Sequence, residues 1–258
     1  MKIEYLFDLT NKVAIVTGGG NGIGKASCLL LADAGASVAV GDLKLEDAQK
    51  VADEINASGG KAIAVACNVT VDDDMVNLVN ETVGAFGKIN ILVNNAGGGG
   101  GGRENPFKIT VDEFAWRFKL NVFSAWRLSQ LCVPHMEKDG YGSIINITSM
   151  SSINRSPNMS AYAASKAAIN HMTTNLAMDF GGSKVRVNAV GPGATKTAAL
   201  ASVLTPEIEA KMLAHTPIKR LGEVNDIAGA VLYFAAPISE WVSGETLFVN
   251  GGGVQTLD

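Results

Sequence analysis

The sequence predicts an α/β fold in which a doubly wound parallel sheet of seven strands is flanked by helices. Short apolar runs alternate with amphipathic helical patterns along the chain, and 47% of the residues are hydrophobic. A glycine-rich turn joins the first such strand to the first helix. Alternation of this kind builds parallel βαβ units with right-handed crossovers. No linker, repeat or charge block divides the 258 residues, so we expect a single domain over residues 1–258.

Charge and composition exclude several classes of function. The formal net charge is −4 at pH 7, and lysine and arginine are scattered, which does not favour a nucleic-acid-binding protein. The longest apolar stretches fall far short of the ~18 residues that a membrane span requires. Residues 1–10 lack the apolar region of a signal peptide. We therefore expect a cytoplasmic protein that binds neither nucleic acid nor membrane.

Neither the cysteines nor the histidines are spaced like metal ligands, so we expect no metal site. The three histidines are well separated along the chain. The three cysteines are odd in number and stand far apart in apolar contexts, which predicts core thiols of a reducing compartment rather than disulfides. They are Cys28, Cys67 and Cys132.

The hydrophobic patterns predict the order of the elements. Strands are expected at residues 13–16, 37–41, 61–69, 89–93, 143–149, 184–190 and 245–250. Helices are expected at residues 26–34, 46–58, 72–86, 110–136, 160–180 and 224–235, with a further short helix after Pro206. Segment 198–213 is apolar enough to form a lid over a flat hydrophobic ligand, although an interface or core helix fits its pattern equally well.

The glycine turn after the first strand is a candidate phosphate site. Its sequence is Gly18-Gly19-Gly20-Asn21-Gly22-Ile23-Gly24. Glycine lets the backbone approach a ligand closely and adopt positive φ without strain. The first N–H groups of a helix are unpaired and carry the positive end of its dipole, which suits a phosphate. The turn therefore predicts a site for the pyrophosphate of a dinucleotide.

Asp42 ends the second predicted strand, about twenty residues beyond the glycine turn. A carboxylate at this place accepts hydrogen bonds from the hydroxyls of an adenosine ribose. It also repels a 2′-phosphate, which favours NAD over NADP. A helix cap or a loop aspartate would look the same in isolation, but the glycine turn supports the ribose interpretation. Asn68 and Asn95 fall at the same edge of the predicted sheet.

Tyr162 and Lys166 stand four residues apart on the helix predicted at 160–180, so their side chains share one face. An ammonium beside a phenol stabilises the phenolate and lowers a pKa that starts near ~10. That change makes tyrosine a usable general base near neutral pH. Ser149 ends the preceding strand, where its hydroxyl could hold the substrate oxygen. A strand-end cap is the alternative interpretation of Ser149 alone.

These motifs together resemble the classical short-chain dehydrogenase/reductase family over almost the whole chain. The resemblance implies a Rossmann-type sheet and hydride transfer between a nicotinamide ring and an alcohol or ketone. It also implies a homotetramer, which the spacing of residues does not show. The matching motifs are, in order, Thr17-Gly18-x3-Gly22-Ile23-Gly24, Asn94-Asn95-Ala96-Gly97, Asn121, Ser149, Tyr162-x3-Lys166 and Pro192-Gly193-x3-Thr197.

The resemblance implies a role for each matching residue. Tyr162 would be the acid/base, Lys166 would lower its pKa and hold the nicotinamide ribose, and Ser149 would position the substrate oxygen. Asn121 would support Lys166 through a water molecule. The implied cofactor contacts are Gly18, Gly22, Ile23, Gly24, Asp42, Leu43, Asn68, Val69, Asn95, Tyr162, Lys166, Thr195 and Thr197. The implied substrate contacts are Gly99, Ser149, Asn154 and Tyr162.

Within this family the chain is most similar to the bacterial 7α-hydroxysteroid dehydrogenases. The similarity lies outside the general motifs, in segments 121–124, 146–150, 205–209, 215–218 and 251–255. It implies NAD-dependent oxidation of the 7α-hydroxyl of a bile acid to a ketone. The alternatives are a reductase of another ketone, such as a 3-oxoacyl thioester or a sugar, and a non-catalytic sensor of the dinucleotide. The intact catalytic set argues against a sensor, because a sensor need not keep an acid/base.

Two departures from the family pattern bear on the site. Asn68 stands where the family usually has an aspartate that accepts from the adenine amino group. The asparagine side-chain oxygen can also accept, so we expect NAD to bind, with weaker affinity. Residues 97–102 are six consecutive glycines, which predicts a mobile rim of the cleft. The run is longer than in the relatives and adds Arg103 and Glu104 near the cleft mouth.

Overall fold

The computed structural model describes residues 3–98, 104–201 and 204–253. Within those residues, seven parallel strands form one sheet in the order β3-β2-β1-β4-β5-β6-β7, which confirms the predicted fold class. The strand order reverses between β1 and β4. The strands are β1 (Val13–Thr17), β2 (Ser37–Asp42), β3 (Lys61–Ala66), β4 (Ile91–Asn94), β5 (Gly142–Ile147), β6 (Val185–Pro192) and β7 (Thr246–Val249).

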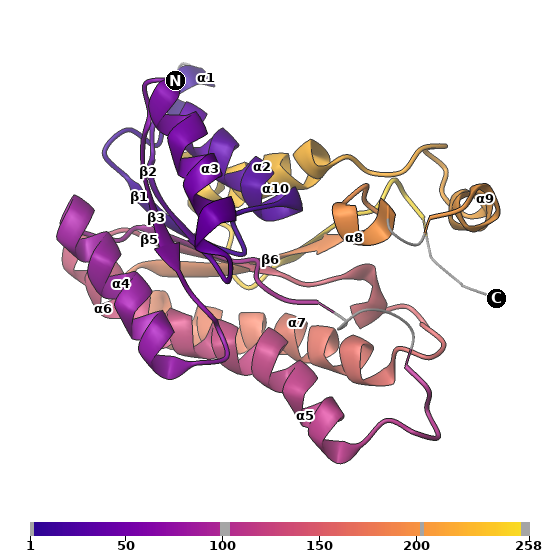
Figure 1. The fold of residues 1–258 in the computed structure, drawn as a ribbon. Coiled ribbons are helices and arrows are strands. Elements are labelled where there is room, and N and C mark those ends of the chain that lie inside the picture. Colours follow the sequence, from indigo (N-terminus) through magenta and orange to yellow (C-terminus); the bar gives the residue numbers. More distant parts are fainter. Residues whose placement is uncertain (1–2, 99–103, 202–203, 254–258) are drawn as a thin grey trace.

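Helices cover both faces of the sheet, as Figure 1 shows. One face carries α2 (Gly22–Asp33), α3 (Leu45–Ala57) and α10 (Val224–Ala235). The other carries α4 (Asp72–Phe86), α6 (Ser124–Asp139) and α7 (Ser160–Phe180), with α5 (Val111–Phe118) beside α7. Three shorter helices are α1 (Ile3–Leu6) near the N-terminus and α8 (Ala198–Ala201) and α9 (Pro206–Ala214) after β6.

Burial of both faces explains why the strands are continuous apolar runs. All five residues of β1 are buried, and their side chains alternate between the two layers. Ala14 and Val16 belong to the hydrophobic core that includes α2, α3 and α10. Ile15 belongs to the core that includes α4, α6 and α7. The sheet is therefore rigidly held from both sides, and its carboxyl edge can position side chains precisely.

The three cysteines are free and buried, which confirms the prediction of core thiols. Burial raises the pKa of each thiol, to about 12 for Cys67 and Cys132. Thiols with such raised pKa values hold little thiolate near neutral pH and are poor nucleophiles. These cysteines therefore contribute packing rather than chemistry.

Several predicted boundaries shift. The helix predicted at 110–136 is α5 and α6 joined by a π-helical turn, η1 (Lys119–Phe123). The strand predicted at 143–149 stops at Ile147, and a 3-10 turn, η2 (Met150–Ser152), follows it. The strand predicted at 61–69 stops at Ala66, and the helix predicted from residue 26 begins at Gly22. The helix predicted to end at residue 136 continues to Asp139, and the other boundaries agree within two residues.

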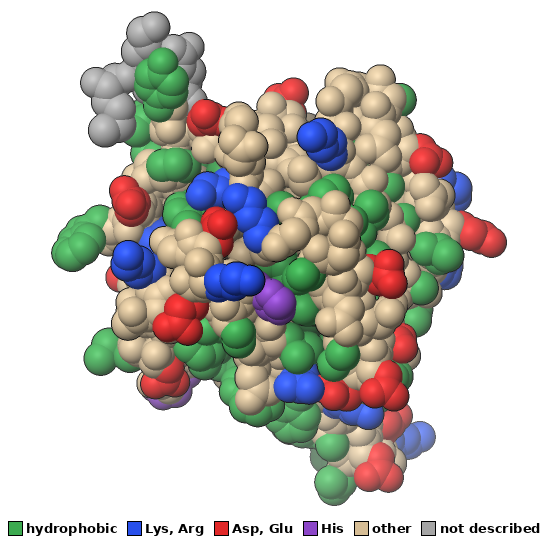
Figure 2. Space-filling model, turned by 90° about the vertical axis from the view of Figure 1, so that its left-hand side faces the viewer, with side chains coloured by type: hydrophobic (Ala, Val, Ile, Leu, Met, Phe, Trp, Pro, Cys, Tyr) green, Lys and Arg blue, Asp and Glu red, His purple; other side chains and the backbone are tan. Residues whose placement is uncertain are grey.

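The described helices, the acidic and metal-ligating side chains and the surface charge add little to the list of possible functions. Among the helices that the structure describes, none combines the length and hydrophobicity that crossing a bilayer requires. The described residues hold no cluster of His, Cys, Asp and Glu arranged to bind a metal ion. On the face drawn in Figure 2, lysine and arginine side chains lie among acidic and hydrophobic ones.

Candidate active site

The glycine turn lies at the carboxyl end of β1, next to the point where the strand order reverses. Open α/β sheets bind ligands at this place. Gly18 and Gly22 adopt positive φ values of 62° and 56°. A Cβ on Gly24 would overlap the Gly18 carbonyl oxygen, so only glycine fits there. The N-cap of α2, Asn21, makes no side-chain cap hydrogen bond. The first amides of α2 therefore stay available for a phosphate.

Asn95 holds the backbone of the glycine turn. Its side-chain nitrogen donates to the carbonyl oxygens of Thr17 (2.9 Å) and Gly18 (3.0 Å). The backbone nitrogens of Asn95 and Ala96 both donate to the Thr17 hydroxyl, at 3.1 Å. These bonds tie the end of β4 to the end of β1. Asn95 therefore shapes the candidate cofactor site through the turn, a function that its position in the sequence does not reveal.

Asp42 lies beside the glycine turn at the end of β2. Its carboxylate oxygens accept from the backbone nitrogens of Gly20 (2.9 Å) and Lys44 (3.0 Å). A carboxylate offers about four lone-pair positions, so it can accept from ribose hydroxyls as well. Leu43, the next residue, is exposed. The placement agrees with the predicted ribose site, because the carboxylate is fixed and still has acceptor capacity.

Asn68 follows the carboxyl end of β3, at the predicted edge of the sheet. Its side-chain oxygen accepts from the backbone nitrogen (3.0 Å) and the hydroxyl (2.8 Å) of Thr70. Both lone pairs of the acceptor that we assigned to the adenine amino group are therefore engaged within the chain. Val69 is buried in the core beside α4, which leaves only its backbone for a ligand. Asn68 therefore closes a local turn in the ligand-free chain, and its contact with the adenine amino group stays a prediction.

Ser149, Tyr162 and Lys166 come together beyond the carboxyl end of β5. The Lys166 ammonium lies 5.9 Å from the centroid of the Tyr162 ring and donates to the Ile147 carbonyl oxygen at 2.8 Å. The Ser149 hydroxyl lies near enough to the Tyr162 phenol to lower the pKa of that phenol. The same Ser149 oxygen accepts from the backbone nitrogen of Ser151 at 3.1 Å, which fixes its direction. The three side chains can therefore act on one substrate oxygen.

The pKa values of this group differ from the expectation. Burial raises the pKa of Tyr162 above its usual value, and the nearby Ser149 hydroxyl opposes that shift. Burial lowers the pKa of Lys166 to about 8, because the side chain is only 4% exposed. The predicted lowering of the Tyr162 pKa was wrong for this state. The phenol is desolvated, and the ammonium is bonded to a backbone carbonyl rather than to the phenol.

Replacing Lys166 with methionine is expected to raise the free energy of unfolding of the ligand-free protein at pH 7 by about 1 kcal/mol. The substitution removes the cost of burying an ammonium, and the loss of the hydrogen bond to Ile147 offsets part of that gain. The Lys166 pKa is about 8 in the folded protein and ~10.4 in the unfolded chain. Between these two pKa values the unfolded chain binds more protons than the folded protein, so stability rises with pH. The cost of the buried ammonium is therefore present in full below pH 8 and is lost as the pH rises. Urea unfolding at pH 7 and pH 9.5 measures the difference, which should shrink at pH 9.5. An equal difference at both pH values contradicts the prediction.

Asn121 lies in η1 and holds the first described part of the glycine run. Its side-chain oxygen accepts from the Gly98 backbone nitrogen at 2.9 Å. Its side-chain nitrogen donates to the Gly98 carbonyl oxygen (3.2 Å) and to the Ser165 hydroxyl (2.9 Å). A Cβ on Gly97 would lie 2.6 Å from the Asn121 oxygen and 3.3 Å from the Lys166 nitrogen. Gly97 thus lies against both side chains, and the water-mediated link between them stays a prediction.

The remainder of the glycine run falls outside the described residues. Gly98 is the last residue that the structure describes before Glu104. The predicted substrate contact at Gly99 and the predicted mobile rim therefore lie in segment 99–103, which is not described.

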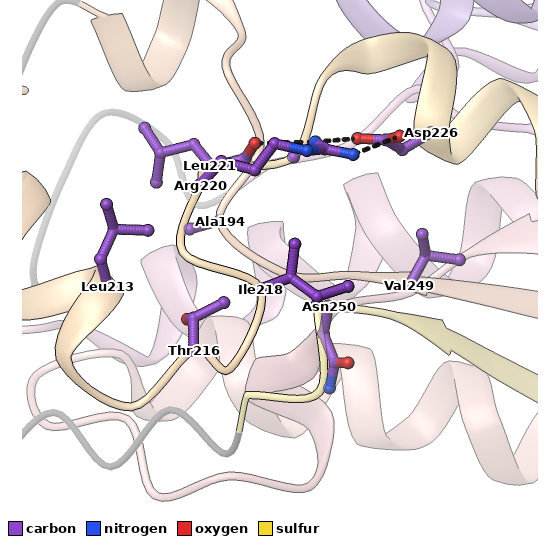
Figure 3. A pocket seen from close by; sticks show the side chains of 11 residues that line it. Ala194, Leu213, Thr216, Ile218, Arg220, Leu221, Asp226, Val249 and Asn250 are labelled. Carbon is purple, nitrogen blue, oxygen red and sulfur yellow. Dashed lines mark hydrogen bonds and ion pairs between the residues drawn. The ribbon is translucent and has the colours of Figure 1, made fainter.

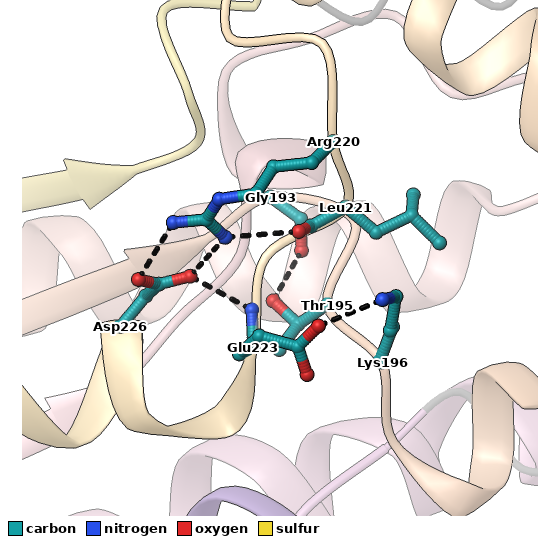
Figure 4. Close-up of polar contacts among 7 residues, drawn as sticks. All are labelled: Gly193, Thr195, Lys196, Arg220, Leu221, Glu223 and Asp226. Atoms are coloured by element: carbon teal, nitrogen blue, oxygen red, sulfur yellow. Dashed lines mark hydrogen bonds and ion pairs between the residues drawn. The ribbon is translucent and has the colours of Figure 1, made fainter.

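The loop after β6 is clamped to the segment that precedes α10 (Figure 4). Thr195 and Gly222 form an isolated parallel bridge, and the Lys196 backbone nitrogen donates to the Gly222 carbonyl oxygen at 2.8 Å. One ion pair crosses between the two segments, from Lys196 to Glu223, and a second, from Arg220 to Asp226, braces the segment before α10. The first has a bond of 2.7 Å, and the second has bonds of 2.6 and 2.9 Å.

Of the two predicted threonines of this loop, Thr197 lies beside the glycine turn. The Thr195 side chain is buried and donates to the Gly193 carbonyl oxygen at 3.0 Å. The Thr197 methyl carbon lies 3.6 Å from the place that a Cβ on Gly22 would occupy. The loop after β6 therefore borders the same space as the turn after β1, and Thr197 faces that space more directly than Thr195.

Asn154 follows η2, and its side-chain nitrogen is buried without a hydrogen-bond partner among the described residues. A buried donor that lacks a partner costs ~1–3 kcal/mol, so an oxygen of a ligand would bind there favourably. Segment 198–213, predicted as a lid or as an interface or core helix, holds α8 and most of α9, while residues 202–203 are not described. No residue of α9 is buried, so its apolar side chains are open to a ligand.

A cavity of about 220 Å³ lies beside the loop after β6, between the end of α9 and β7 (Figure 3). Its lining includes Leu213, Ile218, Leu221 and Val249. None of the candidate catalytic side chains lines it. Its volume is also below the ~300–1,000 Å³ of sites that hold drug-sized ligands. The cavity therefore borders the candidate site without being the place of the chemistry.

Comparison with known proteins decides the family. A model described as "Enoyl-(Acyl carrier protein) reductase" matches residues 18–253. The 7α-hydroxysteroid dehydrogenase of Escherichia coli (strain K12) is 50% identical over 250 residues, 97% of each chain. The chain belongs to the short-chain dehydrogenase/reductase family. The predicted family and oxidoreductase class are confirmed.

Two further members of the family match this chain over nearly its whole length, at higher and at lower sequence identity. A solved 7α-hydroxysteroid dehydrogenase complexed with NADH and 7-oxo glycochenodeoxycholic acid superposes with a TM-score of 0.96. It is 48% identical, and the match covers 100% of both chains. The 3-oxoacyl-[acyl-carrier-protein] reductase of Thermotoga maritima is 34% identical over 246 residues, 95% of this chain and 98% of that one.

Proposed function

We propose that this short-chain dehydrogenase oxidises the 7α-hydroxyl of bile acids to a ketone and uses NAD. The observation that carries the proposal is the meeting of Ser149, Tyr162 and Lys166 beyond β5, at the same sheet edge as the glycine turn. The substrate class is supported by the relative that is 50% identical, whose name states 7α-hydroxysteroid dehydrogenase activity. It is also supported by the neighbour solved with NADH and a 7-oxo bile acid.

The residues at the glycine turn fit a dinucleotide. Gly18, Gly22, Ile23 and Gly24 would hold the pyrophosphate, because the first amides of α2 have no side-chain cap from Asn21. Asp42 would accept from the adenosine ribose and repel a 2′-phosphate, which favours NAD. Lys166 and Thr197 would hold the nicotinamide half. Bound NAD supplies the acceptor for the hydride of the alcohol carbon.

The catalytic side chains have different roles toward the substrate oxygen. Ser149 binds that oxygen, and Tyr162 takes its proton as the alcohol becomes a ketone. The Lys166 ammonium lies close enough to the phenol to stabilise the phenolate that accepts the proton. Asn154 offers its unpaired side-chain donor to a further oxygen of the steroid. The apolar side chains of α9 would cover the flat hydrophobic rings.

A homotetramer in the cytoplasm is the second part of the proposal. Aromatic side chains of α5, η1 and α6 are exposed in the single chain, and a second copy would cover them. They include Trp116, Phe123 and Trp126. The three free, buried cysteines agree with a reducing compartment. Light scattering should give a particle mass four times that of the 26.8 kDa chain, and a mass of one chain contradicts the tetramer.

The reaction is tested by NADH formation from NAD with cholic acid, deoxycholic acid and the 7β epimer of cholic acid. Deoxycholic acid lacks the 7-hydroxyl, so turnover of cholic acid alone is expected. Turnover of all three places the reaction elsewhere on the steroid. No turnover of any, with NADH still bound, refutes the bile-acid assignment. Reduction of a 3-oxoacyl thioester by NADH would then identify the alternative substrate.

A further inference from the structure

Glu104 is a buried carboxylate that none of the roles above uses. It is 8% exposed and directly follows segment 99–103. One of its carboxylate oxygens accepts from the Ala161 backbone nitrogen (2.9 Å) and the Ser160 hydroxyl (3.1 Å). The other accepts from the backbone nitrogen of Tyr162, at 3.0 Å. Glu104 therefore binds the first turn of the helix that carries the candidate catalytic tyrosine.

The first turn of α7 needs such a partner. The first amides of a helix have no acceptor within it, and the N-cap Met159 makes no side-chain cap hydrogen bond. The first backbone bond of the helix runs from Ala163 N to Met159 O, at 2.7 Å. It leaves the amides of Ala161 and Tyr162 to the Glu104 carboxylate. A negative charge is also favourable at the positive end of the helix dipole.

The backbone of Glu104 is fixed to the same region. Its nitrogen donates to the Asn158 carbonyl oxygen at 2.6 Å. Asn158 has a positive φ of 60° and immediately precedes the N-cap of α7. Main chain and side chain of Glu104 thus hold the entrance to α7 at two points, so the carboxylate cannot shift independently of it.

We propose that Glu104 is a positioning residue for Tyr162, an inference that rests on the proposed function of Tyr162 as acid/base. Glu104 fixes the backbone of Tyr162, and the bond from Lys166 to Ile147 fixes the helix one turn later. The phenol is thereby held between Ser149 and the Lys166 ammonium. A displacement of ~1 Å at reacting groups can cost about 100-fold in rate. The glycine turn is held separately by Asn95, so loss of Glu104 leaves the dinucleotide site intact.

The test is Glu104→Gln, which keeps the shape but turns one acceptor into a donor that faces backbone N–H groups. We expect kcat with cholic acid to fall about tenfold and KM for NAD to change by less than about twofold. Hydrogen exchange of residues 159–163 should accelerate. If the glutamine variant does not fold, Glu104→Asp replaces it, because aspartate keeps the charge and has a shorter side chain. The same quantities, kcat with cholic acid and KM for NAD, are then measured.

Glu113→Gln is the matched control. Glu113 also accepts from backbone and hydroxyl groups at a helix N-terminus, that of α5, through Thr110 (2.8 and 3.1 Å). Both variants should lose a few degrees of melting temperature, since each replaces a charged acceptor at a helix N-terminus with a neutral one. Only the Glu104 variant should lose kcat. All assays are run well below both melting temperatures, so that a structural effect alone leaves kcat unchanged.

The outcomes separate this inference from the proposed function. If the unchanged protein oxidises cholic acid and Glu104→Gln keeps its kcat, or if Glu113→Gln loses as much, the positioning role is overturned. If the unchanged protein does not oxidise cholic acid, the proposed function fails, and hydrogen exchange still decides whether Glu104 holds the first turn of α7. Unchanged exchange at residues 159–163 in Glu104→Gln overturns the inference in either case.

Discussion

Tyr162→Phe is expected to lower kcat for cholic acid by about 10²–10⁴-fold, the usual contribution of a general acid or base. Phenylalanine keeps the ring that packs beside Lys166 and removes only the hydroxyl that takes the substrate proton. NADH affinity should therefore stay nearly constant, because the pyrophosphate and ribose sites lie at the glycine turn and Asp42. Steady-state kinetics and a fluorescence titration with NADH measure the two quantities.

Tyr141→Phe is the control for that substitution. The Tyr141 hydroxyl also makes a hydrogen bond within the protein, donating to the Ala235 carbonyl oxygen at 2.6 Å, but it lies outside the candidate site. Its loss should lower stability by about 0.5–1.5 kcal/mol and leave kcat unchanged. If both phenylalanine variants keep the kcat of the unchanged protein, Tyr162 is not the acid/base, and another group must take the substrate proton.

Gly24→Ala is expected to weaken NADH binding by at least about 100-fold, or ~2.7 kcal/mol. A Cβ at this position would overlap the Gly18 carbonyl oxygen and lie 2.5 Å from the Asn95 side-chain nitrogen. The turn must then move, and the bonds from Asn95 that hold its carbonyl oxygens are lost. The amides that would bind the pyrophosphate lose their arrangement. Isothermal titration with NADH measures the loss directly.

Gly229→Ala provides the comparison at a glycine without close neighbours. Gly229 is exposed in the middle of α10, and a Cβ there would meet nothing within 4 Å. Alanine should stabilise that helix by about 0.5–1 kcal/mol and leave NADH affinity unchanged. Full NADH affinity in Gly24→Ala would mean that the dinucleotide binds elsewhere and that the assigned cofactor site is wrong.

Features coded by short stretches of sequence were predictable. The glycine turn could be predicted because its residues are adjacent in the chain, and the pairing of Tyr162 with Lys166 follows from helical spacing alone. The order of elements follows from alternating apolar patterns, since both faces of a parallel sheet must be buried. These predictions needed no knowledge of which distant residues meet.

Features that depend on distant partners were not predictable. The bond from the Tyr162 backbone nitrogen to the Glu104 carboxylate joins residues 58 positions apart, and no local pattern connects the two. The bonds of Asn68 were not predictable either, because its oxygen could serve a ligand or the hydroxyl of Thr70. The π-helical turn at Asn121 was not predicted, because the apolar pattern of α5 continues across it into α6.

The most direct test of the account is the fate of the hydrogen on C7 of the steroid. Cholic acid carrying deuterium at C7 is oxidised with NAD, and the reduced nicotinamide is analysed by mass spectrometry. We predict one deuterium in each reduced nicotinamide, and none when the label is at C3 instead. Reduced nicotinamide without deuterium from the C7-labelled acid would contradict the proposed hydride transfer from C7.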